Sequence, residues 1–534
     1  MASDLLGKMA SRSQTSSGSD VASVGFRVFA MLWAIVHLVE LLSLTYFWTA
    51  SPPGYFVAIL SFWVLWNPDS VASLAALCAV SNYKIWMEMP FIPNHVLLEF
   101  LQNSLVLAAA FQAFIKRGGG AECFRDFARP IRLQVILIYH LAFLQKLNWD
   151  FLNPESSCAT LMYYQIVDQL PLKRTILPFS LVGYLTVYGA LITEAAIPTL
   201  LMITRTRHVG CLLGFAFHTF LGFHENPGVF GFSIYMMPAL FLFLSSEAVS
   251  SVGTRLFVAS DKSFDVTMYR SKSKVWILSL VIWAFGLFMR LDKQKWKWRE
   301  IMSERVFMVD AFLQKKSGHI FWLLCTLWMV WHFVMACTKT NSGTVIPGSK
   351  QRVGLFITFS MMAFNAANPH IGGKTHMTWA MFSNLKTELN PNHLFIKPLR
   401  LMPYQDDMIK IINMKPGLFQ GWIVNPTSIH LYADYRDNWV LPLFELRRLV
   451  NMYKKPLQVV FEYQDGRRVF ATRDSQGNES PSFVFEAPSY WEEKFVWMFR
   501  RNSFDGPNKC DSVTITRGRG TMRPIVKDYK EYVR

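Results

Sequence analysis

The sequence predicts an all-α polytopic membrane domain of about eight to ten transmembrane helices, followed by a small α+β soluble domain. The first observation is composition: 52% of the 534 residues are hydrophobic and only 17% are charged, whereas charged residues make up about 25% of a typical soluble protein. The second is a succession of long apolar runs between residues 24 and 366. The third is a fall in hydropathy and a rise in charge from about Gly372. Together they exclude a disordered chain, which is poor in apolar residues.

The charge balance is strongly basic, with 54 Lys and Arg against 37 Asp and Glu and a net charge of +17. Long apolar runs separate the basic clusters, so the lipid bilayer is the expected partner and nucleic acid is not. We expect the basic loops 116–132, 204–208 and 247–274 to face the cytoplasm. The opposite side then collects 82–94, 147–175, 223–228, 291–318 and everything after about residue 367.

Domain organisation follows from the same hydropathy pattern. Residues 1–23 form a polar, Ser-rich tail, 24–371 the membrane domain, and 372–534 the C-terminal domain. The run 24–48 is longer than the core of a signal peptide, which favours a retained first span, with an organelle transit peptide as the alternative. The candidate spans are 24–48, 95–115, 131–146, 177–203, 209–223, 229–246, 274–290, 319–337 and 353–366.

Several segments carry more local signals. Asn67-Pro68-Asp69 interrupts the apolar stretch 54–81, which predicts one broken span or two short ones. In the C-terminal domain, 438–455 has helical spacing with a late start at Pro442. Residues 456–472 alternate around the turn Asp465-Gly466, as in a β-hairpin, and 512–516 offers another strand.

The seven cysteines form no CxxC pair, which argues against a zinc site or a disulfide framework. The sequence leaves room for a single disulfide bond. It does not decide whether Cys123 or Cys158 takes part in that bond. There is likewise no Walker A motif, no GxGxxG after a strand and no GxSxG. Nucleotide binding is therefore not expected.

Ionisable residues inside apolar runs are costly and are functional candidates by default. His37 and Glu40 lie three residues apart, on one face of the predicted first helix. Glu194 and His140 occur in two later spans. The alternative is a structural role, with hydrogen bonds that hold helices together.

Lys146 ends the apolar run 131–146. A lysine at the end of a span usually extends its ammonium group to the lipid headgroups. In an apolar pocket, however, burial lowers the pKa of a lysine, which can then serve as a general base near neutral pH. Asp150 and Asn153, about one turn further on, could orient the lysine or a substrate.

His218 lies among apolar residues in FAFHTF, and His224 follows six positions later. His218 is either a core histidine or a neutral histidine that acts on a substrate oxygen. A spacing of six puts the two rings on different faces of a helix, and no HExxH pattern is present, so no metal is predicted.

Four segments resemble the vitamin K-dependent γ-carboxylase-like proteins, which share the horizontally transferred transmembrane (HTTM) domain. Residues 139–158 (YHLAFLQKLNWDFLNPESSC) are similar to the family's helix end with Lys-Leu and a following acidic residue. Residues 215–220 (FAFHTF) are similar to its Phe-His helix. Residues 81–97, with Asn82 and Pro93-Asn94-His95, and residues 368–388 (NPHIGGKTHMTWAMFSNLKTE) resemble its polar segment and its Ser-Asn motif. The resemblance covers roughly residues 24–390.

The resemblance implies chemistry for individual residues. Lys146 falls on the position of the family's membrane-embedded lysine, which deprotonates vitamin K hydroquinone; oxygenation then yields a base that removes a glutamyl γ-proton, and carbon dioxide adds. His218 matches the membrane histidine that stabilises a substrate or quinone oxygen. His95, Asp150, Asn153 and His224 are the expected substrate-binding residues.

The expected cofactor is reduced vitamin K or a related quinol, and the expected partners are a lipid quinol and a protein substrate. The expected location is a multi-pass protein of the endoplasmic reticulum or plasma membrane, with an organelle membrane as the alternative. Two departures stand out: Gln145 precedes Lys146 where the family has two adjacent lysines, and the tail after residue 390 does not match the propeptide-binding region. The alternative function is non-enzymatic, a transporter or assembly factor that retains the HTTM fold.

Overall fold

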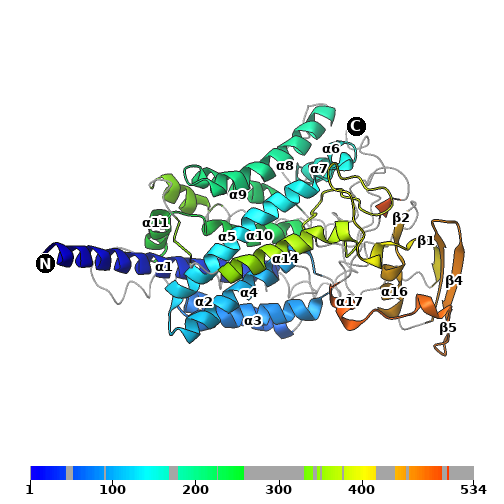
Figure 1. The fold of residues 1–534 in the computed structure, drawn as a ribbon, viewed down its shortest axis with the longest axis horizontal. Helices are drawn as coiled ribbons and strands as arrows, with labels where there is room; N and C mark the ends of the chain where they lie inside the picture. The colour runs from blue at the N-terminus through cyan, green and yellow to red at the C-terminus, as the bar shows by residue number, and fades with distance from the viewer. Residues whose placement is uncertain are drawn as a thin grey trace, which may run out of the picture. The chain divides into compact units, whose positions relative to one another are not determined.

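The computed structural model describes residues 2–43, 52–89, 92–167, 179–224, 227–257, 327, 330–338, 340, 345–348, 352–375, 378–415, 439–452, 456–495 and 502–503. The described chain is mostly helical and carries one antiparallel sheet of six strands, in the order β5-β4-β3-β1-β2-β6, near its C-terminus (Figure 1). The predicted spans at 274–290 and in most of 319–337, and the predicted strand 512–516, lie outside these residues.

The chain forms two compact units, each built from separate stretches of sequence. Unit 1 comprises residues 1–87, 98–136 and 196–359, and unit 2 comprises 88–97, 137–195 and 360–534. The helices of unit 1 are α1 (Ala2–Ser43), α2 (Pro52–Trp66), α3 (Val71–Glu88), α9 (Arg207–Leu221), α10 (Pro227–Phe241) and α11 (Ser246–Phe257). Four further described helices contribute several residues to each unit, α4 (Asn94–Ile115), α5 (Gly120–Gln145), α8 (Phe179–Met202) and α14 (Arg352–Ile371), and the last residue of α3, Glu88, also belongs to unit 2.

Four helical segments are long and apolar enough to cross a membrane: Val21–Leu41, Asn94–Ile115, Gly120–Gln145 and Ser180–Met202. Three shorter apolar helices, Pro53–Trp66, Val71–Met87 and Val229–Phe241, accompany them. The interrupted stretch 54–81 forms two helices, α2 and α3. This agrees with the second of the two predictions, two short spans rather than one broken span. Pro68 lacks the N–H that a continuous helix requires, so the chain turns there and restarts at Val71.

The predicted loop 116–132 is wrong, because α5 already begins at Gly120 and continues through Pro130. A hydropathy average hides this part of α5, because its polar residues alternate with buried apolar ones at helical spacing. The buried Arg132 donates a hydrogen bond from Nη2 to the carbonyl of Ile346 at 3.2 Å, and Lys116 lies 3.9 Å from the carboxylate of the buried Asp126. The basic residues here are therefore partly built into unit 1.

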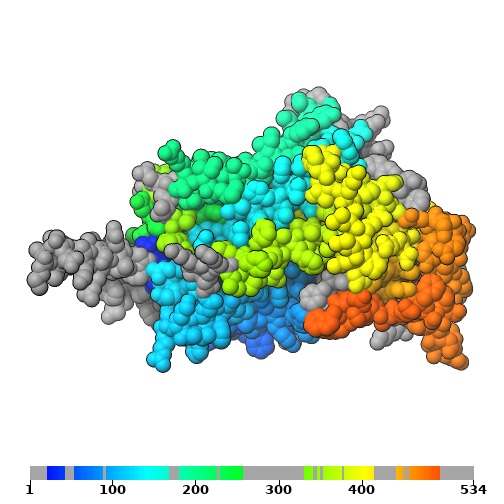
Figure 2. Space-filling view, in the orientation of Figure 1, coloured from blue at the N-terminus to red at the C-terminus, as the bar shows by residue number. Residues whose placement is uncertain are grey.

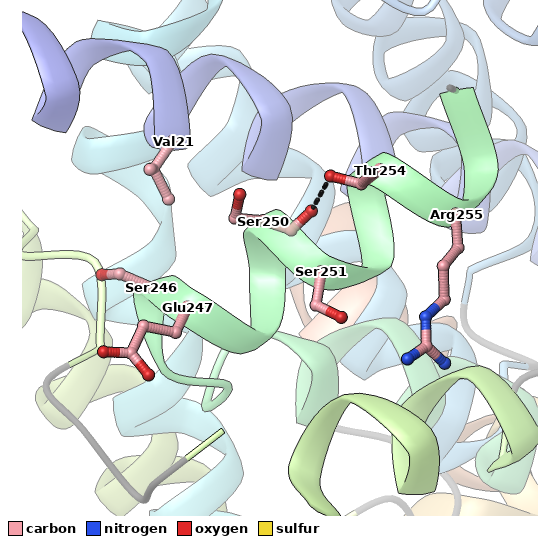
Figure 3. A pocket seen from close by; sticks show the side chains of 7 residues that line it. All are labelled: Val21, Ser246, Glu247, Ser250, Ser251, Thr254 and Arg255. Carbon is pink, nitrogen blue, oxygen red and sulfur yellow. Dashed lines mark hydrogen bonds between the residues drawn. The ribbon is translucent and has the colours of Figure 1, made fainter. Parts of the chain in front are cut away.

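Within unit 1, α1 packs against α2, α10 and α11. The approach to α11 is close, since a Cβ atom on Gly253 would lie 2.2 Å from Cγ1 of Val24. Beside it, the start of the buried part of α1 and one face of α11 line an open groove of about 660 Å³ (Figure 3). The groove is rich in hydroxyl groups. The Thr254 hydroxyl donates a hydrogen bond to the carbonyl of Ser250 at 2.9 Å.

Large apolar side chains remain exposed along several helices. On α2 they recur at helical spacing in Tyr55, Ile59, Trp63 and Trp66. On α14 they include Val353 and Phe356, each 71% exposed, and Figure 2 shows this helix as a green-yellow band on the visible face. These residues form apolar outer faces on otherwise well-packed helices.

Unit 2 contains α6 (Trp149–Leu152), α7 (Cys158–Val167) and the sheet with its short helices. The predicted hairpin is confirmed: β3 (Leu457–Tyr463) pairs with β4 (Arg468–Arg473), and Gly466 has the positive φ of +82° that the turn needs. The late helix start is confirmed too, since α16 (Leu443–Met452) follows Pro442 directly.

The remaining strands of the sheet are β1 (Met408–Lys415), β2 (Trp439–Pro442), β5 (Glu479–Ser480) and β6 (Asn502–Ser503). Strand β1 pairs with β3 through a register shift between Ile411 and Asn413. The short helix α17 (Tyr490–Phe495) and the single 3-10 turns Pro403–Gln405 and Ser482–Val484 complete the described part of this unit.

Candidate active site around Lys146

Lys146 lies in unit 2, immediately after the last residue of α5. Its backbone N–H still donates to the carbonyl of Phe143 at 3.0 Å, so the lysine stands on the final turn of the helix. Asn148 then starts α6 by accepting a hydrogen bond from the N–H of Phe151 at 2.9 Å, the usual role of asparagine at a helix N-cap. The lysine is thus held between a helix end and a capped helix start.

The partner of Lys146 is Glu194, on α8. Nζ of Lys146 lies 2.9 Å from Oε1 of Glu194, and the side chains are only 7% and 11% exposed. The lysine therefore does not extend to an outer surface, as a headgroup-seeking lysine would. Instead its charge is balanced inside the protein, as buried ions require.

An apolar cluster forms the wall beside this pair. Phe151, Val187 and Leu191 are buried together, and Nζ of Lys146 lies 5.8 Å from the centre of the Phe151 ring. Val187, Leu191 and Glu194 follow one another on the same face of α8, at spacings of four and three. The ion pair therefore lies at the edge of an apolar wall.

A buried loop of residues 378–393 packs against this turn. Asn148 donates from Nδ2 to the carbonyl of Ser383 at 2.6 Å. Asn384 donates to the carbonyl of Ser156 at 2.8 Å and accepts from the N–H of Cys158 at 2.9 Å. Short polar side chains of the loop thus satisfy the backbone around α6 and α7, which explains why the loop can be buried.

Asn392 connects the loop to Asp150, which was predicted as a substrate-binding residue. Its Nδ2 donates to Oδ2 of Asp150 at 2.6 Å and to the carbonyl of Asn384 at 2.8 Å. Its Oδ1 accepts from the N–H of Lys386 at 2.8 Å. Asp150 is therefore an anchor of the loop, and through α6 it fixes the turn on which Lys146 stands.

The loop backbone is strained. Trp379, Phe382, Asn384 and Leu389 have φ between +49° and +58°, a left-handed conformation that is uncommon for residues other than glycine. Such outliers persist where surrounding contacts over-determine them, and they gather at functional sites. The strain supports a functional role for this loop.

Two histidines complete the site on the side of α14. His370 Nε2 lies 3.0 Å from Oε1 of Gln145, whose Nε2 donates to the carbonyl of Ala366 at 2.8 Å. The ring centres of His370 and His393 are 5.5 Å apart. Nδ1 of His393 accepts from the N–H groups of Phe395 and Ile396, and burial lowers the pKa of His393, so its ring is held neutral.

The other predicted site residues each have surroundings of their own. Asn153 is exposed, and its side chain accepts from the N–H of Glu155 within its own turn at 3.0 Å. His95 is buried in the first turn of α4. His218 and His224 are buried residues of unit 1, and the ring of His218 contacts those of Phe217 and Phe232 with centres 5.4 and 5.6 Å apart. The sequence predicted Lys146 and Asp150 as site residues, but it did not predict the ion pair of Lys146 with Glu194 or the hydrogen bonds of Asn392.

Among the described residues no group of three His, Cys, Asp or Glu side chains could hold a metal ion. The cysteine question is decided in part: Cys123 is free and buried, whereas Cys158, at the start of α7, is disulfide-bonded. Comparison of the chain with protein-family models, with curated proteins and with solved structures found no match in any of the three.

Proposed function

We propose that the protein is an integral membrane enzyme of the γ-carboxylase-like (HTTM) type, in which Lys146 and Glu194 move a proton to and from a lipid-soluble substrate. A quinol such as reduced vitamin K is the first candidate, and γ-glutamyl carboxylation of a protein substrate is one reaction it would serve. The observation that carries the proposal is the buried contact of 2.9 Å between Lys146 Nζ and Glu194 Oε1 beside an apolar wall.

Membrane insertion is supported by the four long apolar helices and by the apolar outer faces of α2 and α14. Soluble monomers rarely expose continuous apolar surface on this scale. Lipid would cover Ile59 and Trp63 on α2 and Phe356 on α14, which are all more than half exposed. The disulfide at Cys158 fits the predicted exposure of 147–175 to a non-cytoplasmic, oxidising compartment.

The acid–base argument rests on the pair itself. An ammonium and a carboxylate at hydrogen-bonding distance can exchange one proton, giving an amine beside a carboxylic acid. An apolar surrounding disfavours separated charges, so it favours this neutral arrangement relative to water. As an amine, Lys146 Nζ can accept the proton of a substrate hydroxyl, and it returns to the ammonium form as it does so.

The apolar wall suits a ring-shaped substrate. Phe151, Val187 and Leu191 form the apolar side of the site, and Lys146 with Glu194 supplies the polar groups at its edge. A bound quinol supplies an acidic hydroxyl and, once deprotonated, an electron-rich ring that reacts with oxygen. The protein's own contribution is to exclude water, to orient the hydroxyl and to hold the proton on Nζ.

A transporter is the second candidate. Buried ionisable residues such as Glu40 and Glu194 and the break between α2 and α3 are also features of transporters. A transporter would move its substrate across sealed vesicles without changing it, and would depend on Glu40 or Glu194.

The test supplies reduced vitamin K and labelled carbon dioxide to the purified protein in detergent and follows epoxide and fixed carbon separately. We expect Lys146→Ala and Lys146→Arg each to lower the rate by about 10²–10⁴-fold, the usual contribution of a general base. Arginine keeps the ion pair with Glu194 but stays protonated, so Lys146→Arg separates base chemistry from a structural role.

The matched control is Lys397→Ala, because Lys397 is exposed and lies in the same unit. Full activity in a folded Lys146→Ala variant would end the proposal. Epoxide without fixed carbon would keep Lys146 as the base and assign the protein to quinol oxygenation with another acceptor. Transport of an unchanged substrate into vesicles, with dependence on Glu40 or Glu194, would favour the second candidate.

A further inference from the structure

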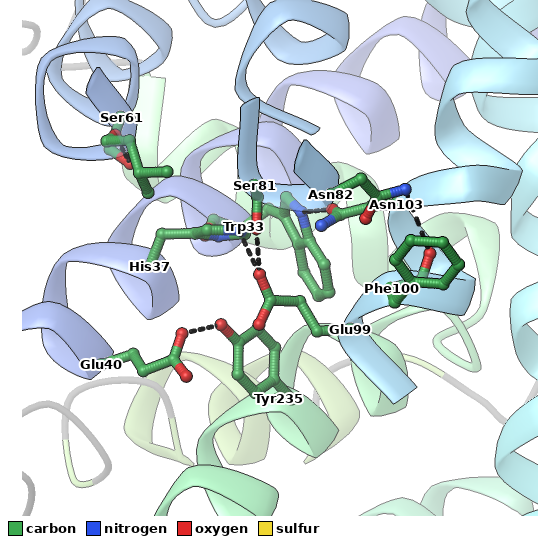
Figure 4. A network of polar contacts seen from close by, with 11 residues as sticks. Trp33, His37, Glu40, Ser61, Ser81, Asn82, Glu99, Phe100, Asn103 and Tyr235 are labelled. Atoms are coloured by element: carbon green, nitrogen blue, oxygen red, sulfur yellow. Dashed lines mark hydrogen bonds and ion pairs between the residues drawn. The ribbon is translucent and has the colours of Figure 1, made fainter. Parts of the chain in front are cut away.

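A second group of buried ionisable residues lies wholly within unit 1, apart from the Lys146 site. It consists of His37 and Glu40 on α1, Lys84 on α3, Glu99 on α4 and Tyr235 on α10, all buried. Figure 4 shows the side chains of His37, Glu40, Glu99 and Tyr235 converging between the helices. His37 and Glu40 were predicted to share a face of the first helix; their partners come from three other helices.

The contact between His37 and Glu99 requires a proton. Nδ1 of His37 lies 2.8 Å from the carbonyl oxygen of Trp33; a carbonyl only accepts, so Nδ1 carries a hydrogen and donates. Nε2 lies 3.1 Å from Oε1 of Glu99. A carboxylate and an unprotonated ring nitrogen would both be acceptors and would repel each other. One of the two groups must therefore carry a proton, His37 on Nε2 or Glu99 on its carboxylate.

The rest of the network balances the charge of that proton. Glu40 accepts a hydrogen bond from the hydroxyl of Tyr235, Glu99 accepts one from the hydroxyl of Ser81, and Lys84 interacts electrostatically with both carboxylates. With Lys84 positive and the two glutamates negative, the network is neutral only while the shared proton is bound. Its loss would leave one net negative charge among buried residues, which is costly.

Aromatic side chains hold the histidine in place. The ring of His37 packs edge-on against Trp33 and Tyr235, with centres 5.3 and 5.9 Å apart. Glu40 and Lys84 lie in the last turns of α1 and α3, and Glu99 in the second turn of α4, so the network is close to helix ends.

An independent observation comes from Gln102, one turn beyond Glu99 on the same face of α4. The residue is 0% exposed, and among the described residues neither polar atom of its amide has a hydrogen-bond partner. Buried polar groups without a protein partner are the places where ordered water binds. Gln102 therefore marks a polar continuation of the network along α4.

We propose that this network is a proton-binding site that takes up one exchangeable proton between His37 Nε2 and Glu99 Oε1. The ligand is a proton rather than a metal cation, because the ammonium group of Lys84 and a protonated His37 would repel a cation. Among the described residues, the other titratable groups that interact with it are Glu40 on α1, Lys84 and Cys78 on α3, and Tyr235 on α10, and the buried His95 lies one turn before Glu99 on α4. The site is independent of Lys146, which belongs to the other unit.

Glu99→Gln is the decisive variant. Its amide can donate to Nε2 of a neutral His37, so the contact is kept without an exchangeable proton, and the network stays neutral with Glu40 and Lys84 charged. The variant should therefore fold. His37→Gln removes the other acceptor, and Glu122→Gln, on the partly exposed start of α5, is the matched control.

The experiment changes the pH of purified protein in detergent, counts protons with an indicator dye and records infrared difference spectra. We expect the wild type and Glu122→Gln to bind one proton per molecule more than Glu99→Gln or His37→Gln. Coupled imidazole and carboxyl bands should be present in the first two and lost in the last two. Lys146→Ala should keep the bands, so failure here is distinguishable from failure of the proposed enzyme.

A folded Glu99→Gln variant with the proton count and bands of the wild type would overturn the proposal, as would a band change that depends on Na⁺. A readout that needs no variant uses wild-type protein with isotope-labelled histidine. An imidazole band that titrates in step with a carboxyl band supports the site, and a carboxyl change without an imidazole change contradicts it.

Discussion

Asn392 donates a hydrogen bond to Asp150 across 242 positions of sequence, with Nδ2 and Oδ2 2.6 Å apart. This single contact ties the strained loop 378–393 to the turn that carries Lys146. The same amide group also bonds to Asn384 and Lys386 within the loop, so the loop and the turn form one hydrogen-bonded structure.

Asn392→Ala should destabilise the protein by about 2–4 kcal/mol, because it removes the hydrogen bond to the half-buried Asp150 carboxylate and the acceptor of the buried N–H of Lys386. Thermal unfolding in detergent measures the effect. Gln476→Ala, at an exposed turn of the C-terminal sheet, is the control and should change stability by less than about 0.5 kcal/mol. Equal melting temperatures for the two variants would show that the loop is not anchored through Asn392.

The neutral ring of His393 predicts acid sensitivity. Burial lowers the pKa of His393 below its ordinary value, so the folded state disfavours protonation. The stabilisation from the neutral ring is present above the unfolded pKa of about 6.5 and is lost as the pH falls below it. Wild-type melting temperatures should therefore drop more between pH 7.5 and pH 5.5, roughly spanning that value, than those of His393→Gln. The same drop in both proteins would exclude this histidine as the cause.

The buried Lys374 predicts that the stability of the folded protein changes at alkaline pH. It is buried just after α14, has no hydrogen-bond or ion-pair partner among the described residues, and burial lowers its pKa to about 8. Its ammonium form therefore costs stability below pH 8, and the cost disappears as the pH rises towards the unfolded value of about 10.4.

Lys374→Met should consequently stabilise the protein at pH 7 by about 3 kcal/mol, the equivalent of this pKa shift, and the gain should vanish near pH 10. Lys397→Met replaces an exposed lysine of the same unit and serves as the reference. A Lys374→Met gain that is independent of pH would mean that apolar contact, rather than the removed charge, stabilises the variant.

The helix α16 contains a buried ion pair, Glu445 with Arg448, whose side chains are 0% and 1% exposed. Arg448→Met alone removes the charged partner of the buried Glu445 carboxylate and should cost about 3–5 kcal/mol. The double variant Arg448→Met with Glu445→Leu should recover most of that loss, because no buried charge remains. Unfolding measurements on the single and double variants test this, and a double variant as unstable as the single one would contradict it.

Sequence patterns predicted those elements whose signal is local. The β3–β4 hairpin followed from alternation around Asp465-Gly466, and the start of α16 followed from Pro442. The start of α5 at Gly120 was missed because its amphipathic first turns lower the average hydropathy. Local periodicity therefore predicted elements better than window averages did.

The candidate site was predictable only in part. Lys146 and Asp150 follow an apolar run, which is a local signal, whereas the pairing of Lys146 with Glu194 depends on how α5 and α8 are rotated about their axes. Asn392 was missed because 378–393 looks like an exposed loop, and its burial depends on contacts with residues more than 200 positions away. The useful signal was the density of Asn, Ser and Thr in a stretch with no glycine.

The left-handed residues of loop 378–393 limit which substitutions, insertions and deletions the loop can accept. Trp379, Phe382, Asn384 and Leu389 occupy fixed places in a buried backbone path, and β-branched residues would be strongly disfavoured at those places. An inserted or deleted residue would shift other side chains into the left-handed positions and move Asn384 and Asn392 away from the groups they satisfy. The segment should therefore tolerate conservative replacement of its side chains far better than any change in its length.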